Sequence, residues 1–292
     1  MDNAAFVDTH VHFWDLSHPT LRWDWLTPEA ADPDLGNYDA IKAQRYTPDD
    51  FAAETRLAGV GKVVHVQAAI GSPDPVDESR WLQAFADEHG VPAAMIAAAD
   101  LADPGVIGLL ERHAAFPAVC GIRDLRYDDY LTDPAWERGY AALERFGFVC
   151  CDDPLVEHMA AAAAVARRHP GIVYCVDHAG FPRRRDPEYF AEWAAGMRSL
   201  ASVENTVVKI SGLGQADHRW TVESLRPWIL ECIELWGPAR AFFGSNWPVD
   251  RLFSSYGDVL DAYEEIISEF TPSERLALWS GTAERVFSLG SG

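Results

Sequence analysis

The chain has 292 residues, of which 48% are hydrophobic and 12% aromatic, so it can form a large packed core. Its 45 acidic and 24 basic residues give a net charge of −21, which disfavours binding to nucleic acid and to anionic membrane surfaces. No apolar stretch has the length of a membrane span, and the first residues lack the basic start and apolar run of a signal peptide. We therefore expect a cytoplasmic protein.

Eight short apolar runs have the composition of buried strands: 5–12, 62–68, 93–100, 118–123, 146–152, 171–178, 206–211 and 240–246. Stretches with helical periodicity separate these runs, and several begin with an N-cap residue or a proline. This alternation predicts parallel strands joined by right-handed crossovers, and eight units at this length suit a TIM-type (β/α)8 barrel. A doubly wound sheet is the alternative, but no GxGxxG motif follows the first strand. We predict an α/β fold with a single domain over residues 1–292.

The segment 13–47, between the first strand and its helix, is unusually long. It contains five aromatic side chains: Trp14, Trp23, Trp25, Tyr38 and Tyr46. Because loops that follow barrel strands build the active face, these rings either wall a pocket there or pack the loop onto the barrel. Trp14 is the one that we include among the expected substrate contacts.

Three histidines stand at the ends of predicted strands. His10 and His12 are two residues apart on the first strand, so both imidazoles can point to one face and converge on one ion or substrate atom. His178 ends the sixth strand, at the same end of the barrel. We expect all three to be catalytic, and three neutral imidazoles would also make a plausible divalent-metal site.

Asn246 ends the eighth strand, which lies beside the first strand in a barrel, so it should approach His10 and His12. An aspartate there could bind metal or accept a proton, whereas an amide can do neither, so we expect Asn246 to position water or substrate. Asp250, four residues further on, is the nearby carboxylate that could take the proton, and we include it among the expected substrate contacts.

Polar residues also mark the ends of three other strands. These are Gln67, Arg123 and Lys209, which we expect to contact substrate. The planar fork of Arg123 matches a carboxylate or a ring carbonyl. Lys209 could equally extend to the rim of the barrel without touching substrate.

Six segments in order resemble one known family: VDTHVHFWD (7–15), VHVQA (64–68), GIRDL (121–125), VDHAGFP (176–182), VKISGL (208–213) and FGSNWPVD (243–250). Together they look like the amidohydrolase superfamily, and within it the amidohydrolase 2 family. That family includes L-fuconolactonase, L-rhamnonolactonase and 2-pyrone-4,6-dicarboxylate lactonase. The resemblance implies a distorted (β/α)8 barrel and the hydrolysis of a lactone ring, with Arg123 contacting substrate.

The resemblance also implies a departure at the strand-eight position, which is usually an aspartate that serves as general base and is Asn246 here. Some relatives have the same FGSN segment. Family members differ over metal, so one zinc held by His10, His12 and His178 and a metal-independent reaction both stay open.

Three functions follow from these residues and from the resemblance. The first is a hydrolase of carboxylic esters that opens a small sugar-acid or aromatic-degradation lactone with a positioned or metal-bound water. The second is a zinc-dependent aromatic-acid decarboxylase of the same superfamily, and the third is an inactive paralogue that binds ligand. The expected partner is an anionic or polyhydroxylated small molecule, with no nucleic acid and no membrane, and a homo-oligomer stays open.

Overall fold

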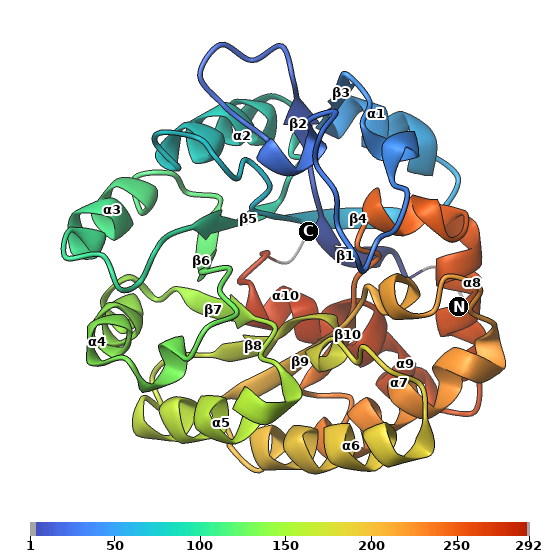
Figure 1. The fold of residues 1–292 in the computed structure, drawn as a ribbon. Coiled ribbons are helices and arrows are strands. Elements are labelled where there is room, and N and C mark those ends of the chain that lie inside the picture. Colours follow the sequence, from blue (N-terminus) through green and yellow to red (C-terminus); the bar gives the residue numbers. More distant parts are fainter. Residues whose placement is uncertain (1–3, 291–292) are drawn as a thin grey trace.

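The computed structural model describes residues 4–290 and confirms the predicted α/β barrel. Eight strands form one parallel sheet whose spatial order follows the chain, and helices surround it (Figure 1). The strands are β1 (Phe6–Val11), β4 (Val60–Val66), β5 (Ala94–Ala98), β6 (Val119–Arg123), β7 (Val149–Asp152), β8 (Tyr174–Val176), β9 (Thr206–Ile210) and β10 (Ala241–Phe243). Each predicted strand is present at its expected place, although most are shorter than predicted.

The barrel closes between β1 and the segment that follows β10. Trp247 forms a parallel bridge with Val11. The backbone N–H of Trp247 donates to the carbonyl of His10 at 3.2 Å, and the N–H of His12 donates to the carbonyl of Trp247 at 2.8 Å. These bonds hold the backbone of both histidines directly beside Asn246.

Eight helices pack around the strands: α1 (Pro48–Thr55), α2 (Val76–His89), α3 (Val106–His113), α4 (Pro134–Ala142), α5 (Met159–Arg168), α6 (Pro187–Ala201), α7 (Val222–Trp236) and α8 (Tyr256–Ile266). Asp133 and Asp186 cap α4 and α6 by accepting a backbone hydrogen bond from the first turn, and a proline follows each cap. Between residues 4 and 290, no helix combines the length and the apolar character needed to cross a membrane.

The helical periodicity of residues 272–288 predicts one continuous helix, but the structure divides this segment into three parts. These are α9 (Pro272–Leu276), a π-helical turn (Ala277–Gly281) and α10 (Thr282–Val286). Phe287, directly after α10, packs against Phe242 inside the barrel with ring centroids 5.4 Å apart. Helix α10 lies behind the strands in Figure 1 and closes the end of the barrel at which they begin.

The long segment 13–47 is fastened at its base by the antiparallel pair β2 (Trp14–Asp15) and β3 (Arg45–Tyr46). Trp14 is fully buried there, with its ring centroid 5.7 Å from that of Trp25 and 5.5 Å from that of Tyr46. The aromatic rings therefore pack the loop onto the barrel, and Trp25 in addition reaches the cavity described below.

Side chains alternate along the strands between the barrel interior and the layer under the helices. In β7, Val149 and Cys151 belong to the interior cluster, whereas Cys150 packs under the helices. In β9, Val207 faces the interior, and Lys209 has the same parity. This alternation decides which of the polar residues at the strand ends can reach the cavity.

Candidate active site

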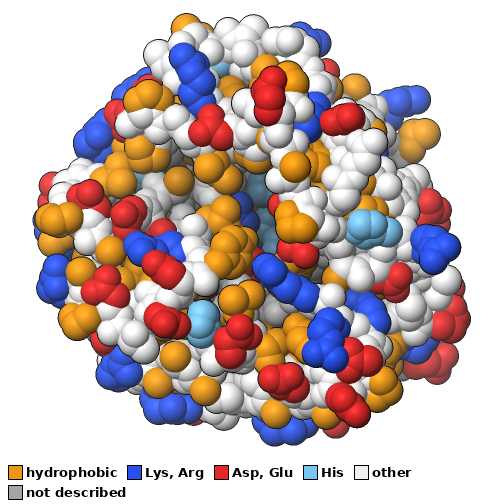
Figure 2. Space-filling model, in the orientation of Figure 1, with side chains coloured by type: hydrophobic (Ala, Val, Ile, Leu, Met, Phe, Trp, Pro, Cys, Tyr) orange, Lys and Arg blue, Asp and Glu red, His pale blue; other side chains and the backbone are white. Residues whose placement is uncertain are grey.

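A cavity of about 250 Å³ opens at the end of the barrel where the strands finish. Figure 2 shows the hollow near the centre of this face, with histidine and basic side chains visible at its depth. Its lining combines the ends of several strands with the loop 13–47. The lining residues are His12, Trp25, Asp32, Asp34, Leu35, Gln67, Ala68, Ile70, Arg123, Leu125, Tyr127, Asp153, His178, Phe181, Gln215, Asn246 and Val249.

The three predicted histidines lie close together at this end of the barrel: His12 and His178 line the cavity, whereas His10 is fully buried and is not part of the lining. The ring of His10 lies between the other two, with its centroid 4.9 Å from that of His12 and 4.3 Å from that of His178. His12 Nδ1 is 2.9 Å from the carbonyl oxygen of Val66, which can only accept, so Nδ1 has the proton and Nε2 is free. Neither ring nitrogen of His10 has a hydrogen-bond partner among residues 4–290.

His178 owes its position to an unusual turn. The strand β8 ends at Val176, two residues earlier than predicted, and His178 adopts φ 52°. Its Nδ1 lies 3.0 Å from Ser211 Oγ. A Cβ on Gly212, which has φ +62°, would lie 2.5 Å from the same nitrogen, so only glycine fits beside the ring.

All three rings are neutral near pH 7. Burial lowers the pKa of His10 and of His12 well below the usual value, and neighbouring positive groups act in the same direction. Burial also lowers the pKa of His178 to about 3. Neutral imidazoles with free ring nitrogens are the ligands that zinc takes in proteins, so the donor chemistry of the three histidines fits a metal ion.

The donor nitrogens of the three histidines nevertheless do not all lie within 4.8 Å of one another. In the described part of the chain, the group whose donor atoms all lie within 4.8 Å of one another consists of Cys151, Cys175 and Asp177, deeper in the barrel. Binding of one ion by His10, His12 and His178 would therefore require their side chains to converge further.

The deeper group does not fit a metal, because it already surrounds a cation. The ammonium of Lys209 lies 2.8 Å from Asp177 Oδ1 and 3.9 Å from Cys151 Sγ. Burial raises the pKa of the Cys175 thiol well above its usual value, which keeps the thiol protonated. Although burial disfavours the charged ammonium, the Asp177 carboxylate raises the pKa of Lys209 above its usual value.

Asn246 and Asp250 form a pair at the edge of the cavity. Asn246 lines the cavity, and its Nδ2 donates to Asp250 Oδ1 at 2.9 Å. Asn246 has φ 59°, a conformation that asparagine adopts more readily than most residues. Asp250 is buried beneath it, away from the lining, and burial raises the pKa of its carboxyl to about 7.

Asp8 holds this segment against β1. Its buried carboxylate accepts hydrogen bonds from Ser245 N at 2.8 Å, Ser245 Oγ at 2.6 Å and the hydroxyl of Tyr256 at 2.9 Å. The residue before Asn246 is thereby fixed to the strand that holds His10.

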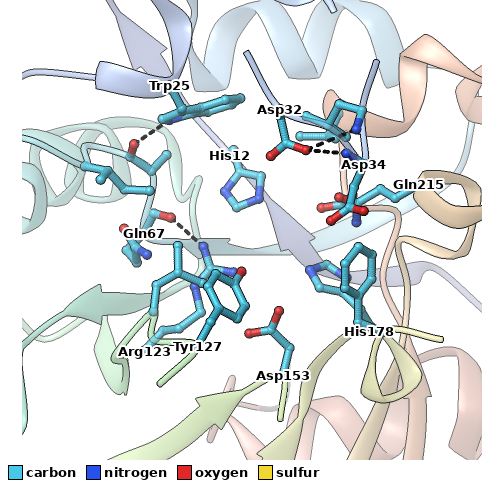
Figure 3. Close-up of a pocket in the computed structure, with 17 residues that line it drawn as sticks. His12, Trp25, Asp32, Asp34, Gln67, Arg123, Tyr127, Asp153, His178 and Gln215 are labelled. Carbon is cyan, nitrogen blue, oxygen red and sulfur yellow. Dashed lines mark hydrogen bonds between the residues drawn. The ribbon is translucent and has the colours of Figure 1, made fainter. Parts of the chain in front are cut away.

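Gln67 and Arg123, two of the expected substrate contacts, also line the cavity. Arg123 Nη2 donates to the backbone carbonyl of Gln67 at 3.0 Å, which fixes the guanidinium (Figure 3). Arg123 Nε and Gln67 Oε1 are buried without a hydrogen-bond partner among the described residues. Buried polar atoms that lack partners mark a place where a ligand can supply them.

Like Asp250, two further predicted substrate contacts lie outside the cavity lining. Trp14 is fully buried at the base of the loop, where its Nε1 donates to the carbonyl of Ala43 at 2.9 Å. Lys209 neither lines the cavity nor extends to the rim; it is fully buried against Asp177 in the barrel interior. The alternation along β9 points its side chain inward, and the Asp177 carboxylate keeps the ammonium there.

The cavity contains three carboxylates that the sequence prediction did not include. Asp32 and Asp34 come from the loop 13–47, and Asp153 directly follows β7 (Figure 3). Asp153 has the same signal as His178, a polar residue at the end of a buried strand. The apolar run predicts a strand that ends at residue 152, so Asp153 falls just outside the predicted strand.

Comparisons with known proteins give the same assignment as the motifs. A family model described as amidohydrolase matches residues 7–289. The chain is 34% identical to an uncharacterized protein of Sinorhizobium fredii, over 97% of this chain and 98% of that protein. It is 31% identical to an L-fucono-1,5-lactonase of Burkholderia multivorans, over 98% of this chain and 97% of that enzyme.

The crystal structure of an amidohydrolase from Burkholderia multivorans with bound zinc matches with a TM-score of 0.83 at 28% identity, covering 98% of this chain and 100% of that one. The chain therefore belongs to the amidohydrolase family.

Proposed function

We propose that this protein hydrolyses a small lactone, and that its substrate is a polyhydroxylated sugar-acid lactone. Membership of the amidohydrolase family and similarity to an L-fucono-1,5-lactonase support a hydrolase of this kind. The cavity volume of about 250 Å³ suits a molecule of one sugar ring.

The observation that carries the substrate class is the charge of the lining. Three carboxylates (Asp32, Asp34 and Asp153) and three amides (Gln67, Gln215 and Asn246) line the cavity together with the guanidinium of Arg123. A second guanidinium, that of Arg183, lies 3.6 Å from Asp34 Oδ2, so the carboxylates still outnumber the positive charges. Hydroxyl groups of a sugar can donate to carboxylates and exchange hydrogen bonds with amides. A pyrone dicarboxylate would bring two further negative charges to this lining, which like-charge repulsion disfavours.

Arg123 is the residue that we propose to bind the ring carbonyl. Its guanidinium is fixed by the backbone of Gln67, and its buried Nε has no partner among the described residues. A fixed donor in a buried site stabilises the negative charge that develops on the carbonyl oxygen during attack by water.

His10, His12 and His178 would hold the metal if one is bound. A zinc ion there would supply Lewis-acid polarisation and a water of lowered pKa. The neutral rings and the free nitrogens of His10 and His12 support this proposal, as does the bound zinc of the similar Burkholderia multivorans amidohydrolase.

A panel of lactones assayed with a pH indicator tests the proposal, because ring opening releases an acid. We expect turnover of sugar-acid lactones, with 2-pyrone-4,6-dicarboxylate a much poorer substrate. No turnover of either class above the buffer rate, with and without added zinc, would refute the hydrolase. Release of CO2 from aromatic acids would instead support the decarboxylase, and turnover only in the Asn246→Asp variant would support an inactive binding protein.

A further inference from the structure

Asp153 presents its carboxylate to the cavity from the end of β7. It has the same parity as Val149 and Cys151, which face the barrel interior, whereas Asp152 points the other way and accepts hydrogen bonds from Tyr130 and Tyr174. In Figure 3 the Asp153 side chain lies between Arg123 and Tyr127 on one side and His178 on the other.

This carboxylate is the exception among the buried ones. Asp8, Glu78, Asp152, Asp177 and Asp250 are also buried, and each has a hydrogen-bond or ion-pair partner. Within residues 4–290, no hydrogen bond or ion pair reaches the carboxylate of Asp153, which is only 7% exposed. A buried carboxyl group without partners destabilises the fold, so packing alone does not account for its position.

We propose that Asp153 is the acid–base residue of the lactone hydrolysis and performs the proton transfer that Asn246 cannot. The inference rests on the proposed function. Asp250, the carboxylate suspected from the sequence, is a poorer candidate because it is absent from the cavity lining and its Oδ1 already accepts from Asn246. The free carboxylate of Asp153 borders the same space as Arg123.

The step needs no further reactant. Asp153 accepts a proton from water while the water oxygen forms a bond to the carbonyl carbon, and the carbonyl π electrons move to oxygen beside Arg123. The tetrahedral intermediate then collapses, the bond between the carbonyl carbon and the ring oxygen breaks, and the ring oxygen takes the proton from Asp153. The product is a hydroxy acid, and Asp153 is again ionised.

The surroundings suit this role near neutral pH. Burial raises the pKa of Asp153 to about 7, an effect that Asp152 and Asp177 increase and the positive charges of Arg123 and Arg183 oppose. Tyr127 and Tyr130 are also titratable and lie nearby, and His178 faces the Asp153 side chain from the other side (Figure 3). A general base is most effective when its pKa lies near the working pH.

The test compares the wild type with Asp153→Asn, Asp153→Glu and Asp128→Asn on a sugar-acid lactone that the wild type hydrolyses. Asp128→Asn is the control, because it removes a carboxylate that lies at the surface and pairs with Arg126. Asp153→Asn should lower kcat about 10²–10⁴-fold and abolish the rise of kcat/KM with pH near pH 7. Asp153→Glu should recover part of kcat, and Asp128→Asn should match the wild type.

The outcomes separate the two proposals. Wild-type turnover together with an unchanged kcat and pH profile in Asp153→Asn would overturn the role of Asp153 and leave the lactonase standing. Loss of bound zinc in Asp153→Asn would also overturn it, by making Asp153 a metal ligand. If the wild type itself opens no lactone, the proposed function fails and the role of Asp153 fails with it. Thermal unfolding of each variant shows whether a loss of rate reflects a loss of fold.

Discussion

The side-chain amide of Asn246 donates a hydrogen bond to the carboxylate of Asp250, with 2.9 Å between Nδ2 and Oδ1, and both residues are buried. The amide at the strand-eight position is thus the donor of a buried hydrogen bond whose acceptor is the Asp250 carboxylate. An aspartate at position 246 would bring a second carboxylate against Asp250, and two buried carboxyl groups in contact cannot both ionise without a large penalty.

We therefore expect Asn246→Asp to lower the free energy of unfolding by about 2–4 kcal/mol at pH 8. The double variant Asn246→Asp/Asp250→Asn restores one amide and one carboxylate in reversed order and should recover most of that loss. Urea unfolding of both variants measures the difference. Equal losses in the single and double variants would show that the pair is not coupled.

The raised pKa of Asp250 predicts a specific dependence of stability on pH. Its folded-state pKa of about 7 lies above the unfolded value of about 4. Between these values the folded protein keeps a proton that the unfolded chain has released, so stability falls as pH rises. Relative to Asp250→Asn, the wild type should lose about 1.4 kcal/mol per pH unit from pH 4 to 7, with no further change above. Parallel stability curves for the two proteins would contradict the shift.

Lys209 and Asp177 form a buried ion pair, so removing one charge leaves the other buried without a partner. Lys209→Met should destabilise the protein by about 3–5 kcal/mol, because the Asp177 carboxylate then stays buried without its partner. Adding Asp177→Asn to that variant should restore a substantial part of the loss. A double variant as unstable as the sum of the two single variants would argue against the pairing.

Zinc binding distinguishes the two groups of donor atoms. If the histidines hold the metal, the wild type should bind one zinc per chain, and His12→Ala should abolish stoichiometric binding. Cys175→Ala should leave it unchanged, because the deeper group already contains the Lys209 ammonium. Metal analysis after dialysis measures the stoichiometry, and zinc retained in His12→Ala but lost in Cys175→Ala would reverse the assignment.

The barrel could be predicted because strand and helix periods alternate eight times, and the cavity residues His12, Gln67, Arg123, His178 and Asn246 could be predicted because parallel strands end on one face. The exact strand ends and the local backbone conformation at the site could not be predicted. β8 and β10 end before the predicted limits, and His178 and Asn246 take left-handed conformations that no periodicity shows.

The placement of Lys209 depends on a partner that is distant in sequence. From sequence alone, a lysine near a strand end is expected to extend to the rim of the barrel. Only the carboxylate of Asp177, which follows the neighbouring strand β8, stabilises the ammonium in the barrel interior. Likewise, the sequence predicts that Trp14 contacts substrate, whereas in the structure its ring packs against Trp25 and Tyr46.

Ring opening of a sugar-acid lactone in ¹⁸O-labelled water, followed by NMR and mass spectrometry, tests the central claim most directly. The wild type should open the ring well above the buffer rate and place the label in the product carboxylate, and His12→Ala should fall towards the buffer rate. Wild-type rates equal to buffer, with zinc and without, would contradict the assignment of this cavity to lactone hydrolysis.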